Sequence, residues 1–295
     1  MKILNFGSIN IDLVYRVPHL VKPGETLSSN SLSRFSGGKG NNQSVALARA
    51  GAPVFHAGKI GKDGDWIVRL LKDSGANVRF VKKGPGPTGH AVIQVADNGE
   101  NSIILFPGAN RTISLTEIHK TLAHFGKGDI LLLQNEINAI PEIMKAAHQA
   151  GMKIWFNPAP FDPTIPGYPL SLVDLFIVNE IEAADLSGSK AGKPALAALA
   201  SQFPAAQILM TLGAKGAVLK KGKREWRVPA PKVKAVDTTA AGDTFIGYFA
   251  ASLVRGLSPQ QCLTYACKAA ALSVTRKGAA DSIPYKNEVF GEILS

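Results

Sequence analysis

Nine residues near the C-terminal end combine an acid with a possible anion site. They run Asp237-Thr238-Thr239-Ala240-Ala241-Gly242-Asp243-Thr244-Phe245. An apolar helical pattern follows, so Ala240, Ala241 and Gly242 are expected at a helix N-terminus, where free backbone N–H groups and the helix dipole attract anions. Asp243 would lie in the first turn, where a carboxylate can take a proton from a hydroxyl that attacks a phosphate. The stretch suggests phosphoryl transfer to an alcohol with Asp243 as the base. The alternative is an ordinary capped helix with Asp243 paired to the dipole.

Further polar residues occur where the predicted strands end. In doubly wound sheets such ends meet at one edge, where ligands bind. Singly, each residue is a turn or cap residue, but together they indicate one lined cleft. They are Asn10 and Asp12, Glu136, Asn157, Asn179 and Glu182, Thr211 and Gly213, and Asp237 and Asp243. Asn10 and Asp12 are two apart and so lie on one side of extended backbone.

Two of these strand ends could serve a nucleotide. Asn179 and Glu182 lie on one face of a predicted helix, and a carboxylate there would suit Mg²⁺ held largely through water. The alternative is a helix start at which acids favour the dipole. The turn 211–216, which contains Gly213 and Gly216, either contacts a phosphate or is a plain turn. The turn 108–110 is interpreted as having no role.

Gly37-Gly38-Lys39-Gly40 would let the backbone approach a ligand closely. It lacks the Walker spacing, so it is not a P-loop. The chain also lacks Gly-x-Gly-x-x-Gly after its first strand, which argues against a nicotinamide dehydrogenase.

The elements that position these residues follow from hydrophobic periodicity. Helices are expected at 43–50, 66–72, 114–124, 139–149, 180–187, 194–202, 242–255 and 259–276, and strands at 2–7, 53–60, 129–133, 152–157, 174–178, 206–211, 216–220 and 224–228. This alternation predicts a three-layer α/β/α fold with a mostly parallel central sheet. The segments of about 10–36 and 87–107 lack helical period, and the second resembles a hairpin around Asp97-Asn98-Gly99. We expect them to form a small sheet that projects from a single domain, residues 1–295.

Composition narrows the function classes. The net charge of +11 is scattered without interleaved aromatic residues, so we expect no nucleic-acid partner but a solvated surface that favours nucleotide approach. No apolar run is long enough for a membrane span, and the N-terminus does not resemble a signal peptide. Cys262 and Cys267 do not share a helix face, so a disulfide or structural metal is not expected. The expected location is the reducing cytoplasm.

Two signatures resemble the ribokinase family of phosphofructokinase-B type carbohydrate kinases. The first is Gly37-Gly38-Lys39-Gly40-Asn41-Asn42-Gln43-Ser44-Val45-Ala46, preceded by Gly7-Ser8-Ile9-Asn10-Ile11-Asp12. The second is Val236-Asp237-Thr238-Thr239-Ala240-Ala241-Gly242-Asp243-Thr244-Phe245. Asn157-Pro158-Ala159-Pro160, Asn179-x-x-Glu182 and Thr211-Leu212-Gly213-x-x-Gly216 lie between them in family order, so the resemblance covers essentially the whole chain.

The resemblance implies transfer of the γ-phosphoryl of ATP to a sugar hydroxymethyl, with D-ribose as the lead acceptor. It implies Asp243 as base, with Ala240, Ala241 and Gly242 as the anion hole. It implies sugar contacts from Asn10, Asp12, Gly38, Lys39, Gly40, Asn42 and Glu136, and nucleotide contacts from Asn179, Thr211, Gly213, Gly216, Gly242 and Cys267. Glu182 would be associated with Mg²⁺, and Asp237, Thr239, Ser273, Arg276, Gly278 and Ser282 would ring K⁺. The small sheet would be a lid over the sugar and the contact of a homodimer.

The chain departs from the family pattern at two places. Asn41 stands beside the sugar pocket where ribokinases commonly have Ala, and Cys267 and Lys268 stand near the adenine side where a His is usual. The exact sugar and nucleotide preference therefore stays open. Another sugar or a nucleoside is an alternative acceptor, and a catalytically silent sugar-binding regulator is the alternative of another class. The intact Asp243 and Gly242 favour the enzyme.

Overall fold

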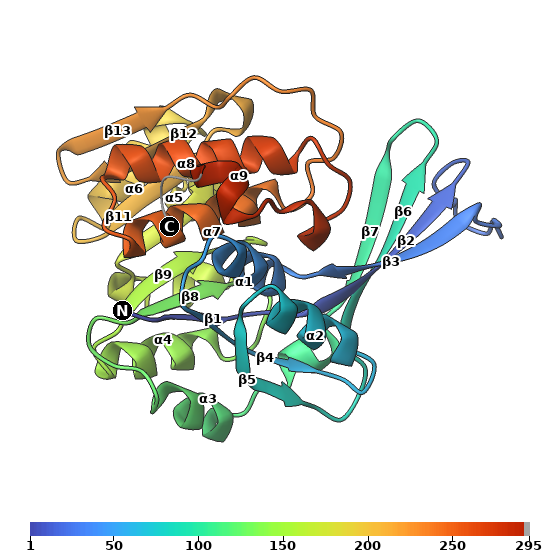
Figure 1. Cartoon of the computed structure of the whole chain (residues 1–295), viewed down its shortest axis with the longest axis horizontal. Helices are drawn as coiled ribbons and strands as arrows, with labels where there is room; N and C mark the ends of the chain where they lie inside the picture. The colour runs from blue at the N-terminus through green and yellow to red at the C-terminus, as the bar shows by residue number, and fades with distance from the viewer. Residues whose placement is uncertain (292–295) are drawn as a thin grey trace.

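The computed structural model describes residues 1–291, and in this range the main sheet has the strand order β13-β12-β11-β10-β9-β8-β1-β4-β5 (Figure 1). Its strands are β1 (Ile3–Phe6), β4 (Val54–Ile60), β5 (Asn77–Lys83), β8 (Ile130–Gln134), β9 (Lys153–Asn157), β10 (Leu175–Asn179), β11 (Gln207–Thr211), β12 (Ala217–Lys221) and β13 (Arg224–Val228). The strands from β11 to β5 in this order run parallel. At one edge, β12 pairs antiparallel with β11, and β13 pairs antiparallel with β12.

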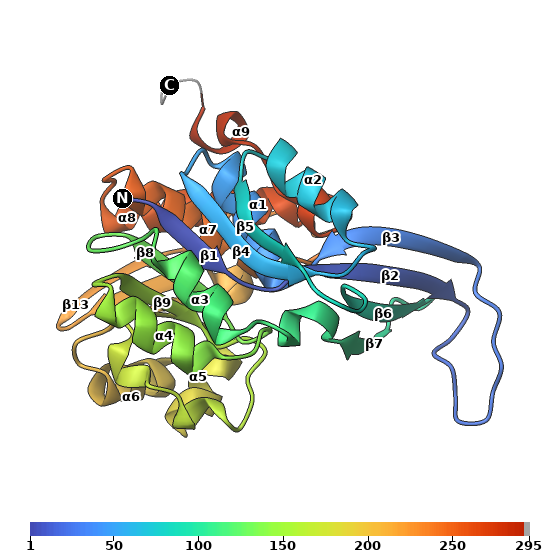
Figure 2. The ribbon, with the colours of Figure 1, turned by 90° about the horizontal axis from the view of Figure 1, so that it is seen from below.

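The central strands of this sheet are buried on both faces, because they carry apolar side chains at almost every position. In β8, Ile130 and Leu132 enter one hydrophobic cluster, and Leu131 and Leu133 enter the other. The first cluster is completed by α1, α2, α7, α8 and α9, and the second by α3, α4, α5 and α6. Figure 2 shows α3 to α6 below the sheet, with α1 and α2 on the opposite side.

The helices begin and end where the sequence supplies caps or turns. They are α1 (Lys39–Arg49), α2 (Asp65–Asp73), α3 (Leu115–Leu122), α4 (Ile140–Gln149), α5 (Glu180–Ser187), α6 (Lys193–Gln202), α7 (Ala241–Val254), α8 (Pro259–Ser273) and α9 (Lys286–Phe290). Ser114 and Ser258 form capping boxes at the starts of α3 and α8, which satisfies backbone N–H groups that each helix leaves free. Within residues 1–291, no helix is long and apolar enough to cross a membrane.

A second, four-stranded sheet has the order β3-β2-β6-β7 and projects from the body on the right of Figure 1. Its strands are β2 (Asn10–Val17), β3 (Ser31–Gly37), β6 (Gly89–Ala96) and β7 (Asn101–Phe106). β2 pairs in parallel with β6, and the other pairings are antiparallel. The predicted fold class, a layered α/β fold with a small additional sheet, is confirmed.

Several predicted boundaries are wrong. The last predicted helix ends at Ser273 instead of residue 276, because the Val274 carbonyl accepts the backbone N–H groups of Val236 and Asp237 rather than one of a further helical turn. The sequence prediction missed the edge strand β5, in which charged residues interrupt the apolar pattern, and the short helix α9. It also began α1 at residue 43 instead of Lys39, because glycines and asparagines disfavour a helix unless tertiary contacts hold it.

Candidate active site

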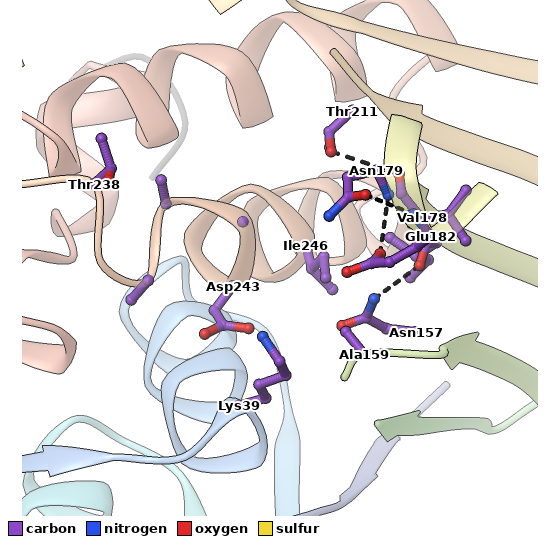
Figure 3. A pocket seen from close by; sticks show the side chains of 14 residues that line it. Lys39, Asn157, Ala159, Val178, Asn179, Glu182, Thr211, Thr238, Asp243 and Ile246 are labelled. Atoms are coloured by element: carbon purple, nitrogen blue, oxygen red, sulfur yellow. Dashed lines mark hydrogen bonds between the residues drawn. The ribbon is translucent and has the colours of Figure 1, made fainter. Parts of the chain in front are cut away.

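The N-terminus of α7 forms one wall of a pocket at the carboxyl ends of the sheet strands (Figure 3). Ala240, the residue before the helix, has a left-handed conformation with φ 58°. The helix supplies no acceptor for the N–H groups of its own first turn, and Ala241, Gly242 and Asp243 line the pocket there. Of these groups, the Ala241 N–H donates to the Thr238 carbonyl at 3.3 Å. This wall therefore offers backbone donors and the positive end of a helix dipole to an anion.

Asp243 is nearly buried, and two amide side chains from α1 hold its carboxylate. Asn42 Nδ2 donates to Oδ2 at 3.1 Å, and Gln43 Nε2 donates to Oδ1 at 2.9 Å. Burial raises the pKa of Asp243, while the charge of Lys39 and the two amide donors act in the opposite direction. Each carboxylate oxygen can accept a further hydrogen bond, so this group can receive a proton from a hydroxyl in the pocket.

The glycine-rich segment places Lys39 and Glu136 beside Asp243. Gly38 caps α1 with φ 88°, a conformation that favours glycine. Lys39 N–H donates to Glu136 Oε2 at 2.9 Å, and the Ser8 hydroxyl donates to the same oxygen. In Figure 3 the Lys39 side chain points toward the Asp243 carboxylate. Burial alone would lower the pKa of Lys39, but the nearby carboxylates, Asp243 above all, hold it above its usual value.

Asn10 and Asp12 occupy the start of β2, where the small sheet meets the body. Burial raises the pKa of Asp12 to about 6, and the negative charges of Glu136 and Asp243 contribute. Asn10 Oδ1 accepts a hydrogen bond of 2.7 Å from Asn110 Nδ2. The predicted sugar-side residues thus converge on the side of the site where Asp243 lies.

The opposite wall carries the residues predicted for the nucleotide, and Asn179, Glu182 and Thr211 all line the pocket. Asn179 Oδ1 accepts the backbone N–H groups of Ile181 and Glu182, and Glu182 Oε2 accepts that of Asn179. Asn179 and Glu182 therefore cap the start of α5, as the alternative interpretation of the sequence predicted, and both also line the pocket. Burial raises the pKa of Glu182. Gly213 and Gly216 bound a short turn after β11 and have positive φ values of 56° and 104°.

Asp237 joins two loops behind the N-terminus of α7. Its Oδ1 accepts the N–H and hydroxyl of Thr239, and its Oδ2 accepts Gly278 N–H at 3.0 Å. These bonds lower the pKa of Asp237 although its partial burial opposes them. The Ser273 and Ser282 hydroxyls donate to carbonyls of their own turns, and the Arg276 side chain binds Glu288. Any cation here would therefore use backbone carbonyls and hydroxyl lone pairs rather than a cluster of carboxylates.

Cys267 lies apart from the pocket lining. It is 4% exposed in the hydrophobic cluster between α8 and the sheet, and burial raises its pKa to about 11. It is not among the residues that line the pocket in the described range. Lys268 donates to the Val289 carbonyl at 2.7 Å.

Sequence reasoning assigned no role to Asn110 or Gln43. Asn110 is buried and binds both the N–H and the carbonyl of Ile9 as well as the Asn10 side chain. Gln43 contacts the Asp243 carboxylate directly. A glutamine in a helix and an asparagine in a turn are common on surfaces, so only their burial identifies them.

The chain belongs to the pfkB family of carbohydrate kinases, because the family described as "pfkB family carbohydrate kinase" matches residues 1–286. It is therefore a sugar kinase, a phosphotransferase, and the predicted family and enzyme class are confirmed. A ribokinase of Haemophilus influenzae is 38% identical over 291 residues, 96% of this chain and 95% of the relative. A deoxyribokinase of Salmonella typhi is 33% identical and matches 100% of this chain and 99% of its own length. The solved structure of Arabidopsis thaliana ribokinase, complexed with ribose and ATP, is similar with a TM-score of 0.89 and 33% identity, and covers 98% of this chain and 97% of its own.

Proposed function

We propose that this protein transfers the γ-phosphoryl of ATP to the hydroxymethyl oxygen of D-ribose and forms ribose 5-phosphate. The observation that carries the proposal is the position of Asp243, buried between a helix N-terminus that lines the pocket and the polar residues of α1 and β2. The similarity to ribokinases over nearly the full chain supports ribose and ATP as the substrates.

In the proposed reaction, the hydroxymethyl O–H gives its proton to Asp243, and its oxygen forms a bond to the γ-phosphorus. The bond from that phosphorus to the bridging oxygen breaks, and its electron pair leaves with ADP. The Gly242 N–H group, with Ala240 and Ala241 beside it at the positive end of the helix dipole, and Lys39 stabilise the negative charge on the transferred group. Closure of the small sheet over the sugar would exclude water as a competing acceptor.

The remaining residues bind the two substrates. Asn10, Asp12, Asn42, Glu136 and the backbone of 38–40 would bind the sugar hydroxyls. On the other side, Asn179 and Thr211, with the turn that contains Gly213 and Gly216, would contact the nucleotide. The predicted nucleotide contact of Cys267 is not part of this proposal, because its side chain is buried in the hydrophobic cluster. The small sheet, from segments of about 10–36 and 87–107, would close over the sugar as a lid within a single kinase domain of residues 1–295.

Two cations fit the residues present. Among residues 1–291 no group of three or more acidic, His or Cys side chains could hold a metal ion. Mg²⁺ would therefore be held by the ATP phosphates and by water that Glu182 orients, and when bound it neutralises phosphate charge. K⁺ would lie between the loops that Asp237 joins, with Thr239, Ser273, Arg276, Gly278 and Ser282 around it.

A cytoplasmic homodimer formed through the small sheet is also proposed. Ile103, Ile104, Leu105 and Phe106 of β7 are each between 46% and 66% exposed, a large apolar surface for one short strand. A second copy of the sheet would cover it. Sedimentation should therefore give a dimer for the wild type and a monomer for Ile104→Lys.

The test is ATP consumption by the purified protein against a panel that includes ribose, 2-deoxyribose, fructose and adenosine, with Mg²⁺ and with or without K⁺. Ribose should give the highest kcat/KM, and K⁺ should raise the rate. A preference for 2-deoxyribose or a nucleoside would identify another acceptor within the family. No turnover on any acceptor would contradict the proposal.

A further inference from the structure

A chain of buried amide side chains connects the glycine-rich segment to Asp243 beneath the pocket. Asn5 Nδ2 donates to the Gly40 carbonyl at 2.7 Å and to Ser44 Oγ at 2.8 Å. Gln134 Nε2 donates to Asn5 Oδ1 at 2.9 Å and to Gln43 Oε1 at 2.6 Å. Asn5, Gln43 and Gln134 are each 0% exposed. Gln43 Nε2 then donates to Asp243 Oδ1 at 2.9 Å and, at 3.3 Å, to Asn157 Oδ1.

The two ends of this chain can only accept hydrogen bonds, and this fixes every amide between them. The Gly40 carbonyl requires the NH₂ of Asn5, so the Asn5 oxygen must face Gln134. Gln134 must then offer its NH₂ to Asn5, and it offers the second hydrogen of that NH₂ to the Gln43 oxygen. Gln43 is left with its NH₂ toward Asp243.

The same arrangement explains an unpaired atom. Gln134 Oε1 is buried and has no hydrogen-bond partner within residues 1–291. With three amides between two acceptors, one amide must use its nitrogen twice and leave its oxygen unused. A buried oxygen without a hydrogen-bond partner destabilises a fold. An apolar side chain at position 134 would therefore be more stable, unless the amide is needed to orient Gln43.

The far end of the chain carries no charge that could compete with Asp243. Ser44 Oγ lies 2.7 Å from His56 Nδ1. Burial lowers the pKa of His56 to about 3, which the Gly7 carbonyl only partly offsets, so His56 is neutral at physiological pH. The charged groups that act on Asp243 are Lys39, Asp12, Glu136 and Glu182, and none belongs to the amide chain.

We propose that Gln134 is a positioning residue for phosphoryl transfer, which locks the Gln43 amide so that its NH₂ always faces Asp243. This inference rests on the proposed role of Asp243 as the base. Without Gln134, only Asp243 itself and a longer contact of 3.3 Å to Asn157 Oδ1 hold the Gln43 NH₂. The Gln43 amide can then rotate and place its oxygen against the carboxylate, which disfavours the ionised form. The Asn42 amide, which donates to Asp243 Oδ2, is held less firmly in its orientation, because its own oxygen accepts only a long contact of 3.4 Å from Asn41 Nδ2.

The test uses Gln134→Met, which keeps the side-chain length and removes both donors, with Gln134→Glu and Gln43→Met beside it. The first measurement is the pKa of Asp243 by carbon NMR on protein with labelled aspartate, which does not depend on the sugar. The second is the pH profile of kcat with the preferred acceptor. Loss of one hydrogen bond to a carboxylate raises its pKa by about one unit. The pKa of Asp243 and the acid limb of the kcat profile should therefore both move up by about one pH unit.

A double-mutant cycle separates orientation from general loosening. If Gln134 acts through Gln43, the double variant Gln134→Met/Gln43→Met should shift the pKa no further than Gln43→Met alone. Ser252→Ala is the matched control, because this buried hydroxyl of α7 has no partner within the described residues. It should leave both readouts at wild-type values.

An unchanged Asp243 pKa and acid limb in a folded Gln134 variant would overturn the inference, and Gln134→Glu provides a second, isosteric variant if Gln134→Met does not fold. An equal shift in Ser252→Ala would also overturn it. If the wild type phosphorylates no acceptor, the proposed function fails, but the NMR titration still decides the role of Gln134.

Discussion

Replacement of Asp243 by asparagine removes the proposed base and changes the volume of the site very little. Asn42 and Gln43 would still surround residue 243, but an asparagine offers one oxygen where Asp243 offers two. One of the two donors would therefore face an NH₂ group, which costs about 1–3 kcal/mol. Loss of a buried carboxylate offsets part of this cost. We therefore expect a folded protein that still binds sugar.

The chemical step should suffer far more than binding. A positioned general base typically contributes about 10²–10⁴-fold. At 1.36 kcal/mol for each factor of ten, this raises the barrier by about 2.7–5.4 kcal/mol. Single-turnover transfer from labelled ATP would measure the loss, and calorimetry would measure the sugar Kd, which should change less than about tenfold.

The matched control is Asp129→Asn. This carboxylate also has two backbone donors, but it lies before the amino end of β8, whereas the pocket lies at the carboxyl ends of the strands. Its transfer rate should equal that of the wild type. A near-normal rate in Asp243→Asn would refute the assignment of the base, and an equal loss in Asp129→Asn would point to general destabilisation.

Three further predictions concern the sugar side. Asn110→Ala frees the Asn10 side chain and should raise KM for the sugar about tenfold, the equivalent of one hydrogen bond, while kcat changes less than about threefold in steady-state assays. Because the pKa of Asp12 is about 6, its carboxylate is lost as the pH falls through that value, so KM should rise about tenfold per pH unit below it; a flat KM profile would exclude Asp12 as a sugar ligand. Gly40→Ala would force a Cβ into the backbone of Ser8, and urea unfolding should reveal a loss of about 1–3 kcal/mol or more; unchanged stability would mean that this contact relaxes freely.

The sequence was sufficient to predict the layered fold and residues on both walls of the pocket. Apolar runs with period two or 3.6 predict strands and helices well, and polar residues at parallel strand ends must meet at one edge. Asn179, Thr211 and Asp243 were found in this way and line one pocket. The roles predicted for these and the other site residues, and for Mg²⁺ and K⁺, stay predictions.

The parts that the sequence did not predict depend on contacts between distant residues. Asn110 acts on a strand that lies 100 residues earlier in the chain, and its turn has no local feature that marks it. Asn5 and Gln134 did carry a signal, since each is a polar residue within an otherwise apolar strand. Their partners could not be named without the register of β1 against β8, which pairs Asn5 with Leu132.

Transfer to the hydroxymethyl oxygen is tested most directly by phosphorus NMR of the product formed by the wild-type protein from ATP, Mg²⁺ and ribose. The proposed function predicts stoichiometric ADP and one phosphate monoester, coupled to the methylene protons of the terminal sugar carbon. A phosphate on a ring hydroxyl, or ADP released with free inorganic phosphate only, would contradict it.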